Sequence, residues 1–212
     1  MKQFILNYKS RLIKSLEMEA MELIPELGLA LQQAWESKKT VYLCGNGGSA
    51  GNAVHLANDF IYGAGAQVGR GICVESLSAN SAVLTCLAND LGYEEIYAYQ
   101  LKVKAKPGDI LIALSGSGNS PNIVKALEMG NKIGMQTFAI LGFSGGLCKD
   151  IAQISIHFPI DDMQIAEDLQ LIVGHMCMQW LCGQLPQQNG LNGSHGVVTE
   201  NSLSTPSWGG GG

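Results

Sequence analysis

The sequence repeats one pattern twice: a short apolar run, then a loop of small residues, then a stretch with helical spacing. The apolar run 41–44 precedes the loop Gly45–Ala50, and the run 110–114 precedes the loop Ser115–Ser120. Short apolar runs predict buried strands, and a helix that follows such a loop presents free backbone N–H groups at its positive end. Units of this kind bind phosphates and polyhydroxy ligands, so two of them indicate a phosphorylated sugar.

Strands and helices alternate along the rest of the chain. We expect strands near 40–44, 71–75, 110–114, 136–141 and 152–158, and helices near 49–62, 80–88, 93–103, 120–133 and 163–183. This alternation predicts an α/β fold with a doubly wound, mostly parallel sheet flanked by helices. Such sheets bind ligands at the carboxyl ends of their strands, where both small-residue loops are expected.

Two amphipathic helices are predicted before the first strand. Apolar residues recur at three- and four-residue steps over 3–24, and Pro25 is expected to start a second helix. We assign residues 1–38 to this helical pair, as part of the same domain and of an oligomer interface. The alternative is that these helices pack only on their own domain. The α/β domain then spans 39–185, and the Gln-, Asn- and Gly-rich segment 186–212 is expected to be a flexible tail.

Composition and charge argue against several classes of partner. The chain has 212 residues, of which 46% are hydrophobic, and a formal net charge of −5 without a basic stripe. This is enough for one domain with a core, and nucleic acid is not expected as a ligand. We find no secretory signal and no transmembrane-length run, which favours a cytoplasmic protein away from membranes. The six cysteines form no C-x-x-C pair and are expected to be buried free thiols.

Two helices carry the residues with chemical potential. His55 and Asp59 lie four apart on the helix after the first loop, so they share one face and could bind a metal or act as acid and base. A satisfied polar pair at the surface is the alternative. Glu167 and His175 lie on the strongly apolar final helix, where a core histidine is the alternative for His175.

The loop Gly45–Ala50 also fits the dinucleotide-binding pattern G-x-G-x-x-G/A, with Glu75 as the ribose ligand. Glu75 lies thirty residues beyond Gly45, whereas about twenty is usual. The second, hydroxyl-rich loop is not needed for a nicotinamide cofactor. We therefore disfavour dinucleotide binding.

Taken together, the first loop, His55 with Asp59, the segment 84–94 and the second loop resemble the sugar isomerase (SIS) domain, over roughly residues 1–183. Within that family the chain is most similar to the phosphoheptose isomerases. The resemblance implies a homotetramer of one flavodoxin-like three-layer domain with N-terminal helices. It also implies conversion of sedoheptulose 7-phosphate to D-glycero-D-manno-heptose 7-phosphate, for the heptose of surface polysaccharides such as lipopolysaccharide, and one zinc ion at each site.

The resemblance assigns roles to numbered positions. The implied zinc ligands are His55, Asp59, Glu167 and His175, and the implied catalytic residues are Asp59, Glu167 and His175. The implied substrate-binding residues are Asn46, Gly47, Ser49, Asp90, Ser115, Gly116, Ser117, Asn119 and Ser120.

Departures from the family pattern leave alternatives open, and three of them fall on candidate site residues. Asp59 stands where the family has glutamate, Glu167 where it has glutamine, and Gly116 where it has threonine. The shorter aspartate withdraws its carboxylate by about 1–1.5 Å, enough to disturb a geometry-sensitive step. An isomerase of another sugar phosphate is therefore one alternative. A non-catalytic relative that binds the replication initiator is another, although such relatives lack the histidine that His175 matches.

Overall fold

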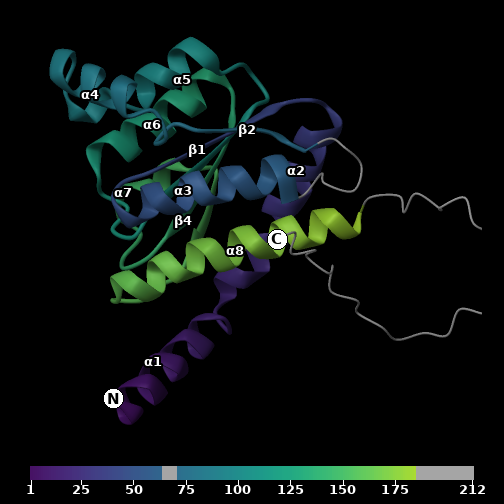
Figure 1. Cartoon of the computed structure of the whole chain (residues 1–212), viewed down its shortest axis with the longest axis vertical. Coiled ribbons are helices and arrows are strands. Elements are labelled where there is room, and N and C mark those ends of the chain that lie inside the picture. Colours follow the sequence, from purple (N-terminus) through teal and green to yellow (C-terminus); the bar gives the residue numbers. More distant parts are fainter. Residues whose placement is uncertain (64–70, 185–212) are drawn as a thin grey trace, which may run out of the picture.

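A computed structural model describes residues 1–63 and 71–184. Figure 1 shows a central sheet between two layers of helices, with the first helix projecting from the body of the domain. The expected flexible tail, 186–212, lies outside the described residues. The expected division into a helical pair, 1–38, and an α/β domain, 39–185, stays a prediction.

The sheet has five strands in the order β2-β1-β3-β4-β5, and its described strand pairs are all parallel. The strands are β1 (Thr40–Gly45), β2 (Cys73–Ser76), β3 (Ile110–Ser115), β4 (Gln136–Leu141) and β5 (Ile154–His157). This order confirms the predicted doubly wound α/β fold. Gly45 pairs with Leu114, so β1 and β3 end side by side where the strand order reverses, which is the ligand-binding edge of such sheets.

Helices separate the strands, and most of them begin or end at a recognisable residue. They are α1 (Lys2–Ser15), η1 (Glu19–Leu23), α2 (Ile24–Glu36), α3 (Gly48–Asn58), η2 (Asp59–Gly63), α4 (Ser81–Asp90), η3 (Tyr93–Glu95), α5 (Ala98–Lys104), α6 (Pro121–Ile133), α7 (Gly146–Ile151) and α8 (Met163–Gly183). Asn80 and Asp162 cap α4 and α8 with their side chains. Gly134 ends α6 in the left-handed conformation that glycine adopts most easily.

Alternate residues of each strand face opposite layers, and this builds two cores. Ile112 and Leu114 of β3 belong to the cluster that includes α2, α3 and α8. Leu111 and Ala113 belong to the cluster formed with α4, α5, α6 and α7. The period of two that strands impose therefore covers both faces of the sheet, as a parallel sheet requires. The helices α3 and α8, which carry His55 and His175, lie in the first layer (Figure 1).

The N-terminal region corrects one prediction. A helix over 3–24 was too long, because α1 ends at Ser15 and Met18 adopts an extended conformation before η1 begins. Pro25 lies in the first turn of α2, as predicted. The short helix α7 was not predicted, because six residues are too few to show a helical period.

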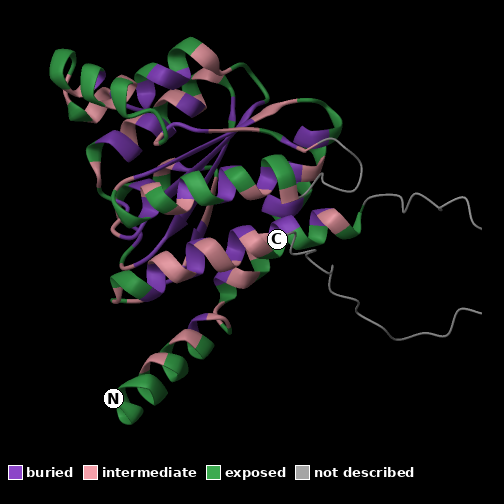
Figure 2. Ribbon diagram, viewed as in Figure 1, coloured by how far each residue is buried: buried purple, intermediate pink, exposed green. Residues whose placement is uncertain are grey.

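The two N-terminal helices differ in burial. Leu27 and Leu31 of α2 are buried in the core, whereas Phe4, Ile5 and Leu6 of α1 are 62%, 56% and 59% exposed. Figure 2 shows α1 as an exposed helix apart from the body of the domain. α1 still contacts its own domain, because the Tyr8 hydroxyl donates to Asp168 and the Tyr8 and Leu12 side chains pack against the core, so its use at an oligomer interface stays a prediction. Within 1–63 and 71–184, no helix combines the length and apolarity needed to cross a membrane.

The cysteines are free, but the expected burial is wrong for two of them. Cys44, Cys148 and Cys177 are buried, whereas Cys73 and Cys86 are exposed. Cys73 begins the edge strand β2. The Cys86 thiol donates to a carboxylate oxygen of Asp90 at the surface of α4, 3.6 Å away.

Candidate active site

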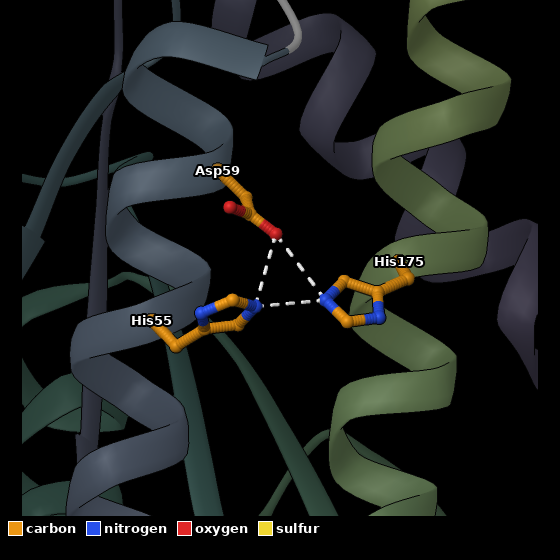
Figure 3. Close-up of side chains that lie close together, drawn as sticks. All are labelled: His55, Asp59 and His175. Carbon is orange, nitrogen blue, oxygen red and sulfur yellow. Dashed lines mark hydrogen bonds and ion pairs between the residues drawn. The ribbon is translucent and has the colours of Figure 1, made fainter. Parts of the chain in front are cut away.

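His55, Asp59 and His175 converge between α3 and α8. The Nε2 atoms of the two histidines lie 3.0 Å apart, and Oδ2 of Asp59 lies 3.3 Å from His55 Nε2 and 3.2 Å from His175 Nε2 (Figure 3). The side chains are 50%, 19% and 37% exposed for His55, Asp59 and His175. Because the three side chains remain partly exposed to solvent, a ligand can reach their nitrogen and oxygen atoms.

The local sequence explains how the two helices bring these residues together. Gly174, next to His175, lets α8 approach α3 closely, because a Cβ there would lie 2.3 Å from Cδ2 of Leu56. Asp59 begins the π-helical turn η2 that follows α3. Such turns are frequent at functional sites, since they redirect a side chain without ending the helix. Neither the close approach nor the π-turn is visible in the four-residue spacing of His55 and Asp59.

The three side chains fit a tetrahedral metal ion. In a zinc site with bonds of about 2.0–2.1 Å, neighbouring ligand atoms lie about 3.3 Å apart. The three donor-to-donor distances, 3.0, 3.2 and 3.3 Å, form a triangle of nearly that size. The potential ligand atoms of the three side chains all lie within 4.8 Å of one another. Within the described part of the chain, no other group of three or more His, Cys, Asp or Glu side chains is this compact. Two imidazoles and a carboxylate are also an ordinary catalytic zinc set, with a position left for substrate or water.

Glu167, the fourth expected ligand, points elsewhere. Its carboxylate lies against Gly48 in the first turn of α3, where a Cβ would be 2.3 Å from Oε1. A carboxylate is favoured there by the positive end of the helix. The neighbouring Asp168 accepts a hydrogen bond from Tyr8 of α1, which raises the pKa of the Tyr8 hydroxyl to about 12. The four-residue ligand set therefore stays a prediction, with three of its members in place.

The first loop is held by a dense polar network. The side-chain amides of Asn46 and Asn122 make two hydrogen bonds with each other, of 2.8 and 2.7 Å. The Asn46 oxygen also accepts from the Tyr93 hydroxyl at 3.1 Å. The Gly45 carbonyl accepts from Tyr97 and, at 3.0 Å, from Ser78. Burial raises the pKa of Tyr97 to about 12, so this hydroxyl stays a neutral donor at physiological pH.

Two further loop residues have structural reasons for their identity. Gly47 has φ +55°, in the region that favours glycine, and it precedes the first residue of α3. The Ser49 hydroxyl is buried and accepts from Gln170 Nε2 at 3.0 Å, while Asn52 donates to the Gln170 oxygen at 2.9 Å. These hydrogen bonds join α3 to α8, the two helices that carry His55 and His175.

The second loop uses its polar groups more locally. Ser115 Oγ accepts from the Gly118 N–H at 3.0 Å, and Ser117 Oγ accepts from the Asn119 N–H at 3.3 Å. Asn119 in turn accepts from the Leu147 N–H at 3.0 Å. Ser120 is the N-cap residue of α6, and its side chain makes no capping hydrogen bond within the described chain. The loop thus presents a hydroxyl at a helix N-terminus, which is suited to an anion.

Gly116 and Asp90 complete the predicted set. A Cβ at Gly116 would lie 2.5 Å from the Met163 sulfur, so Met163 fills the space where the resembling family has a threonine side chain. Asp90 is exposed at the end of α4, where it accepts from Asn89 at 2.8 Å and from Cys86. Its expected contact with sugar stays a prediction.

Several supporting residues were missed by sequence reasoning. Asn122, Tyr97 and Gln170 are each almost fully buried, yet each uses a polar atom to hold a loop residue. For Asn122, the available signal was a short amide one residue after the Pro121 that starts α6, directly behind the second loop.

Comparisons with known proteins agree with this architecture. The SIS domain family model matches residues 4–142, more than half of the chain. The phosphoheptose isomerase of Helicobacter pylori strain P12 is 35% identical over 171 residues, covering 81% of this chain and 88% of that protein. The phosphoheptose isomerase of Chlorobaculum parvum is 32% identical over 174 residues, covering 81% and 83%.

Solved structures show the same fold. The phosphoheptose isomerase of Neisseria gonorrhoeae has a TM-score of 0.75 and 22% identity, and that of Francisella tularensis has 0.77 and 23%. Each comparison covers 86% of this chain and 98% of the other. The fold thus defines an α/β protein of the SIS domain class, in which His55, Asp59 and His175 meet between α3 and α8. Within that class, the chain belongs to the phosphoheptose isomerase family.

Proposed function

We propose that this chain is an aldose–ketose isomerase that converts sedoheptulose 7-phosphate to D-glycero-D-manno-heptose 7-phosphate. The observation that carries the proposal is the convergence of His55, Asp59 and His175 on one point between α3 and α8. Support comes from its relatives, since a chain 35% identical over most of its length is a phosphoheptose isomerase.

The second loop is the proposed phosphate site. Ser115, Ser117, Asn119 and Ser120, with Gly116 between the first two, surround the N-terminus of α6. The free N–H groups and the helix dipole favour a dianion there. Anchored at this end, an open-chain sugar lies across the first loop, where Asn46, Gly47 and Ser49 stand, toward α3. Asp90 is proposed to contact a hydroxyl of the same sugar.

The proposed reaction moves two protons and leaves the sugar's composition unchanged. A base removes a proton from C1 while the C2 carbonyl oxygen gains one, which gives the enediol. A proton then returns to C2 while the C1 hydroxyl loses one, which gives the aldose. General acid–base groups within hydrogen-bond distance of these atoms typically contribute 10²–10⁴-fold to such steps.

We assign the carbon-bound proton to Asp59 or Glu167, and the oxygen-bound protons to His175. Oδ2 of Asp59 lies within 3.3 Å of the Nε2 atoms of both histidines, which supports it as the base. Glu167 becomes a candidate if its carboxylate turns from Gly48 toward the group. The position of His175 beside His55 and Asp59 favours an enzyme over a protein that only binds the replication initiator.

We propose zinc as the cofactor, one ion for each site, held by His55, Asp59 and His175 with Glu167 as the fourth ligand. When bound, zinc would orient the sugar and polarise its oxygens. The donor triangle supports three members of this set, His55, Asp59 and His175. Metal analysis of the purified protein tests it: we expect close to one zinc ion per chain, and its loss in His55→Ala. Full zinc content in His55→Ala would overturn the ligand set.

A homotetramer is the proposed assembly. Exposed apolar residues of α1 and an apolar groove between α2 and α8 support association. The groove is lined by Met21, Ile24, Pro25, Gly28, Leu29, Met176, Cys177 and Trp180. Analytical ultracentrifugation tests the state, and a monomer at micromolar concentration would contradict it. The expected cytoplasmic location stays a prediction.

A panel of sugar phosphates tests the substrate. We expect the highest kcat/KM with sedoheptulose 7-phosphate, and lower values with pentulose and hexulose phosphates. The second candidate, isomerisation of another sugar phosphate, is favoured by Met163 filling the space beside Gly116 and by the charged Glu167 beside the first loop. A higher kcat/KM with a shorter sugar would replace the first candidate with the second.

A further inference from the structure

Two asparagine side chains join the two small-residue loops. Asn46 lies in the first loop, and Asn122 is the second residue of α6, directly after the second loop. Asn46 Nδ2 donates to Asn122 Oδ1 at 2.8 Å, and Asn122 Nδ2 donates to Asn46 Oδ1 at 2.7 Å. The two amides therefore form a closed, reciprocal pair across the point where β1 and β3 end side by side.

The surroundings make this pair rigid. Asn122 is only 1% exposed, and Asn46 Oδ1 also accepts from the Tyr93 hydroxyl at 3.1 Å. A buried amide that lost its partner would keep the cost of leaving water without the compensating bond. Both Asn46 oxygen lone pairs have donors, so the side chain is held in one orientation by the protein itself. Asn46 therefore connects the first loop to the start of α6, in addition to its expected contact with sugar.

We propose that Asn122 is a positioning residue that acts through Asn46. The pair fixes the spacing between the phosphate loop and the first loop, so that a sugar held by its phosphate reaches His55, Asp59 and His175 in register. A misplacement of about 1 Å at the reacting atoms can cost about 10²-fold in rate, so a fixed spacing is useful to this chemistry. The inference rests on the proposed function for the identity of the ligand.

The test compares two ligands that differ in how many loops they contact. Inorganic phosphate needs only the second loop, whereas sedoheptulose 7-phosphate spans both. By calorimetry we expect Asn122→Ala to bind the sugar phosphate about tenfold more weakly and inorganic phosphate within about twofold of wild type, as loss of one buried hydrogen-bond pair predicts. Equal weakening of both ligands, or of neither, would overturn the inference.

Asn131 offers a matched control on the same helix. Its amide donates to the Ile151 carbonyl at 2.8 Å and accepts from Thr137 at 2.7 Å, at the far end of α6 from the site. Asn131→Ala removes a comparable network and is expected to lower stability while the ratio of the two affinities stays as in wild type. A changed ratio in Asn131→Ala would show that general loosening of α6 explains the effect.

Asn122→Asp gives a second readout. An ionised Asp at position 122 accepts from Asn46 but has no proton to donate, whereas its protonated form restores both bonds. The titratable groups on neighbouring elements are Tyr93 and Tyr97, and the Lys125 ammonium with its partners Glu94 and Glu95. We divide the sugar-phosphate affinity of the variant by that of wild type at each pH, so that shared groups cancel. The ratio should rise toward one as pH falls, and a flat ratio would contradict the proposal.

The outcomes separate this inference from the proposed function. If wild type binds sedoheptulose 7-phosphate without turning it over, the isomerase proposal fails while the affinity ratios still decide the role of Asn122. Suppose instead that wild type turns over the sugar phosphate normally, and that Asn122→Ala has the wild-type KM and the wild-type ratio of affinities for sugar phosphate and inorganic phosphate. The isomerase proposal then stands and the inference fails. If wild type binds inorganic phosphate but no sugar phosphate, both fail.

Discussion

The two strand–loop–helix units have similar sequences but use their polar groups in opposite ways. In the first unit, the Asn46 amide is bonded to Asn122 and Tyr93, and the Ser49 hydroxyl is buried against Gln170. In the second unit, the Ser115 and Ser117 hydroxyls accept from N–H groups of the same loop, and the side chain of the N-cap residue Ser120 makes no capping hydrogen bond within the described chain.

This difference suggests separate roles, with the first unit holding the structure together and the second binding an anion. The first unit is anchored to α6, to η3 and to α8, and it begins the helix that carries His55 and Asp59. The second unit keeps a hydroxyl and a helix N-terminus available for an anion. The proposed catalytic group and the proposed phosphate site thus belong to different strand–loop–helix units, and variants in each should affect different kinetic constants.

The largest effect is expected for a substitution in the proposed catalytic group of His55, Asp59 and His175. His175→Ala removes the proposed proton carrier between the sugar oxygens, so kcat should fall by at least about 10²-fold. The KM for the sugar phosphate should change little, because the proposed phosphate site lies on the second loop. Steady-state kinetics measures both constants. His157→Ala is the control, since the His157 ring contacts the Phe143 carbonyl and lies outside the proposed catalytic group. Near-normal kcat in His175→Ala would contradict the assignment.

The close approach of α3 and α8 should be the next most sensitive feature. Gly174→Ala drives a Cβ into the buried Leu56 side chain, 2.3 Å from its Cδ2, and overpacking of this kind costs about 1–3 kcal/mol. Gly51→Ala on α3 is the matched control, because its Cβ would meet no described atom within 4 Å. Urea unfolding should show lower stability for Gly174→Ala and a gain of about 0.5–1 kcal/mol for Gly51→Ala. Equal shifts would mean that the helices are not in tight contact.

A substitution in the proposed phosphate site should have a smaller effect, and this effect should fall on substrate binding alone. Ser120→Ala removes one hydrogen bond to a charged oxygen, so the KM for the sugar phosphate should rise about tenfold while kcat stays within about twofold. Inhibition by inorganic phosphate should weaken by the same factor. A fall in kcat without a change in phosphate inhibition would place Ser120 with the chemistry instead.

The smallest effect concerns the contact between α1 and α8. Tyr8→Phe removes the hydrogen bond to Asp168 and should lower stability by about 0.5–1.5 kcal/mol at neutral pH. The hydrogen bond to Asp168, with burial, raises the Tyr8 pKa from 10.0 to about 12, so the neutral hydroxyl is favoured in the folded protein. Its contribution is present below pH 10 and is lost as pH rises toward 12. The stability gap between wild type and Tyr8→Phe should therefore close over that interval, and a constant gap would argue against this hydrogen bond.

The fold could be predicted from local pattern because its signals are local. Apolar runs at 110–114 and 136–141 mark strands that are buried on both faces, and Pro121 and Gly134 mark where α6 starts and ends. The break after Ser15 escaped prediction, because the apolar spacing continues through the non-helical residues before η1. Periodicity reports which residues share a face and carries no information on where the backbone turns.

The site could be predicted only in part, because its geometry depends on contacts between distant segments. The spacing of His55 and Asp59 placed both on one face, but the meeting with His175 depends on Gly174 and Leu56, 118 positions apart in sequence. The orientation of Glu167 toward Gly48, and the pairing of Asn46 with Asn122, are likewise set by tertiary packing. No local pattern encodes them.

The most direct test of the account is the reaction of wild-type protein with sedoheptulose 7-phosphate in D₂O, followed by NMR. Proton transfer by residues beside the enediol predicts an aldose product that carries deuterium at C2, because an acid–base group open to solvent exchanges its proton. Absence of the aldose, or an aldose with no deuterium at C2, would contradict the assignment of the His55, Asp59 and His175 group as the isomerisation centre.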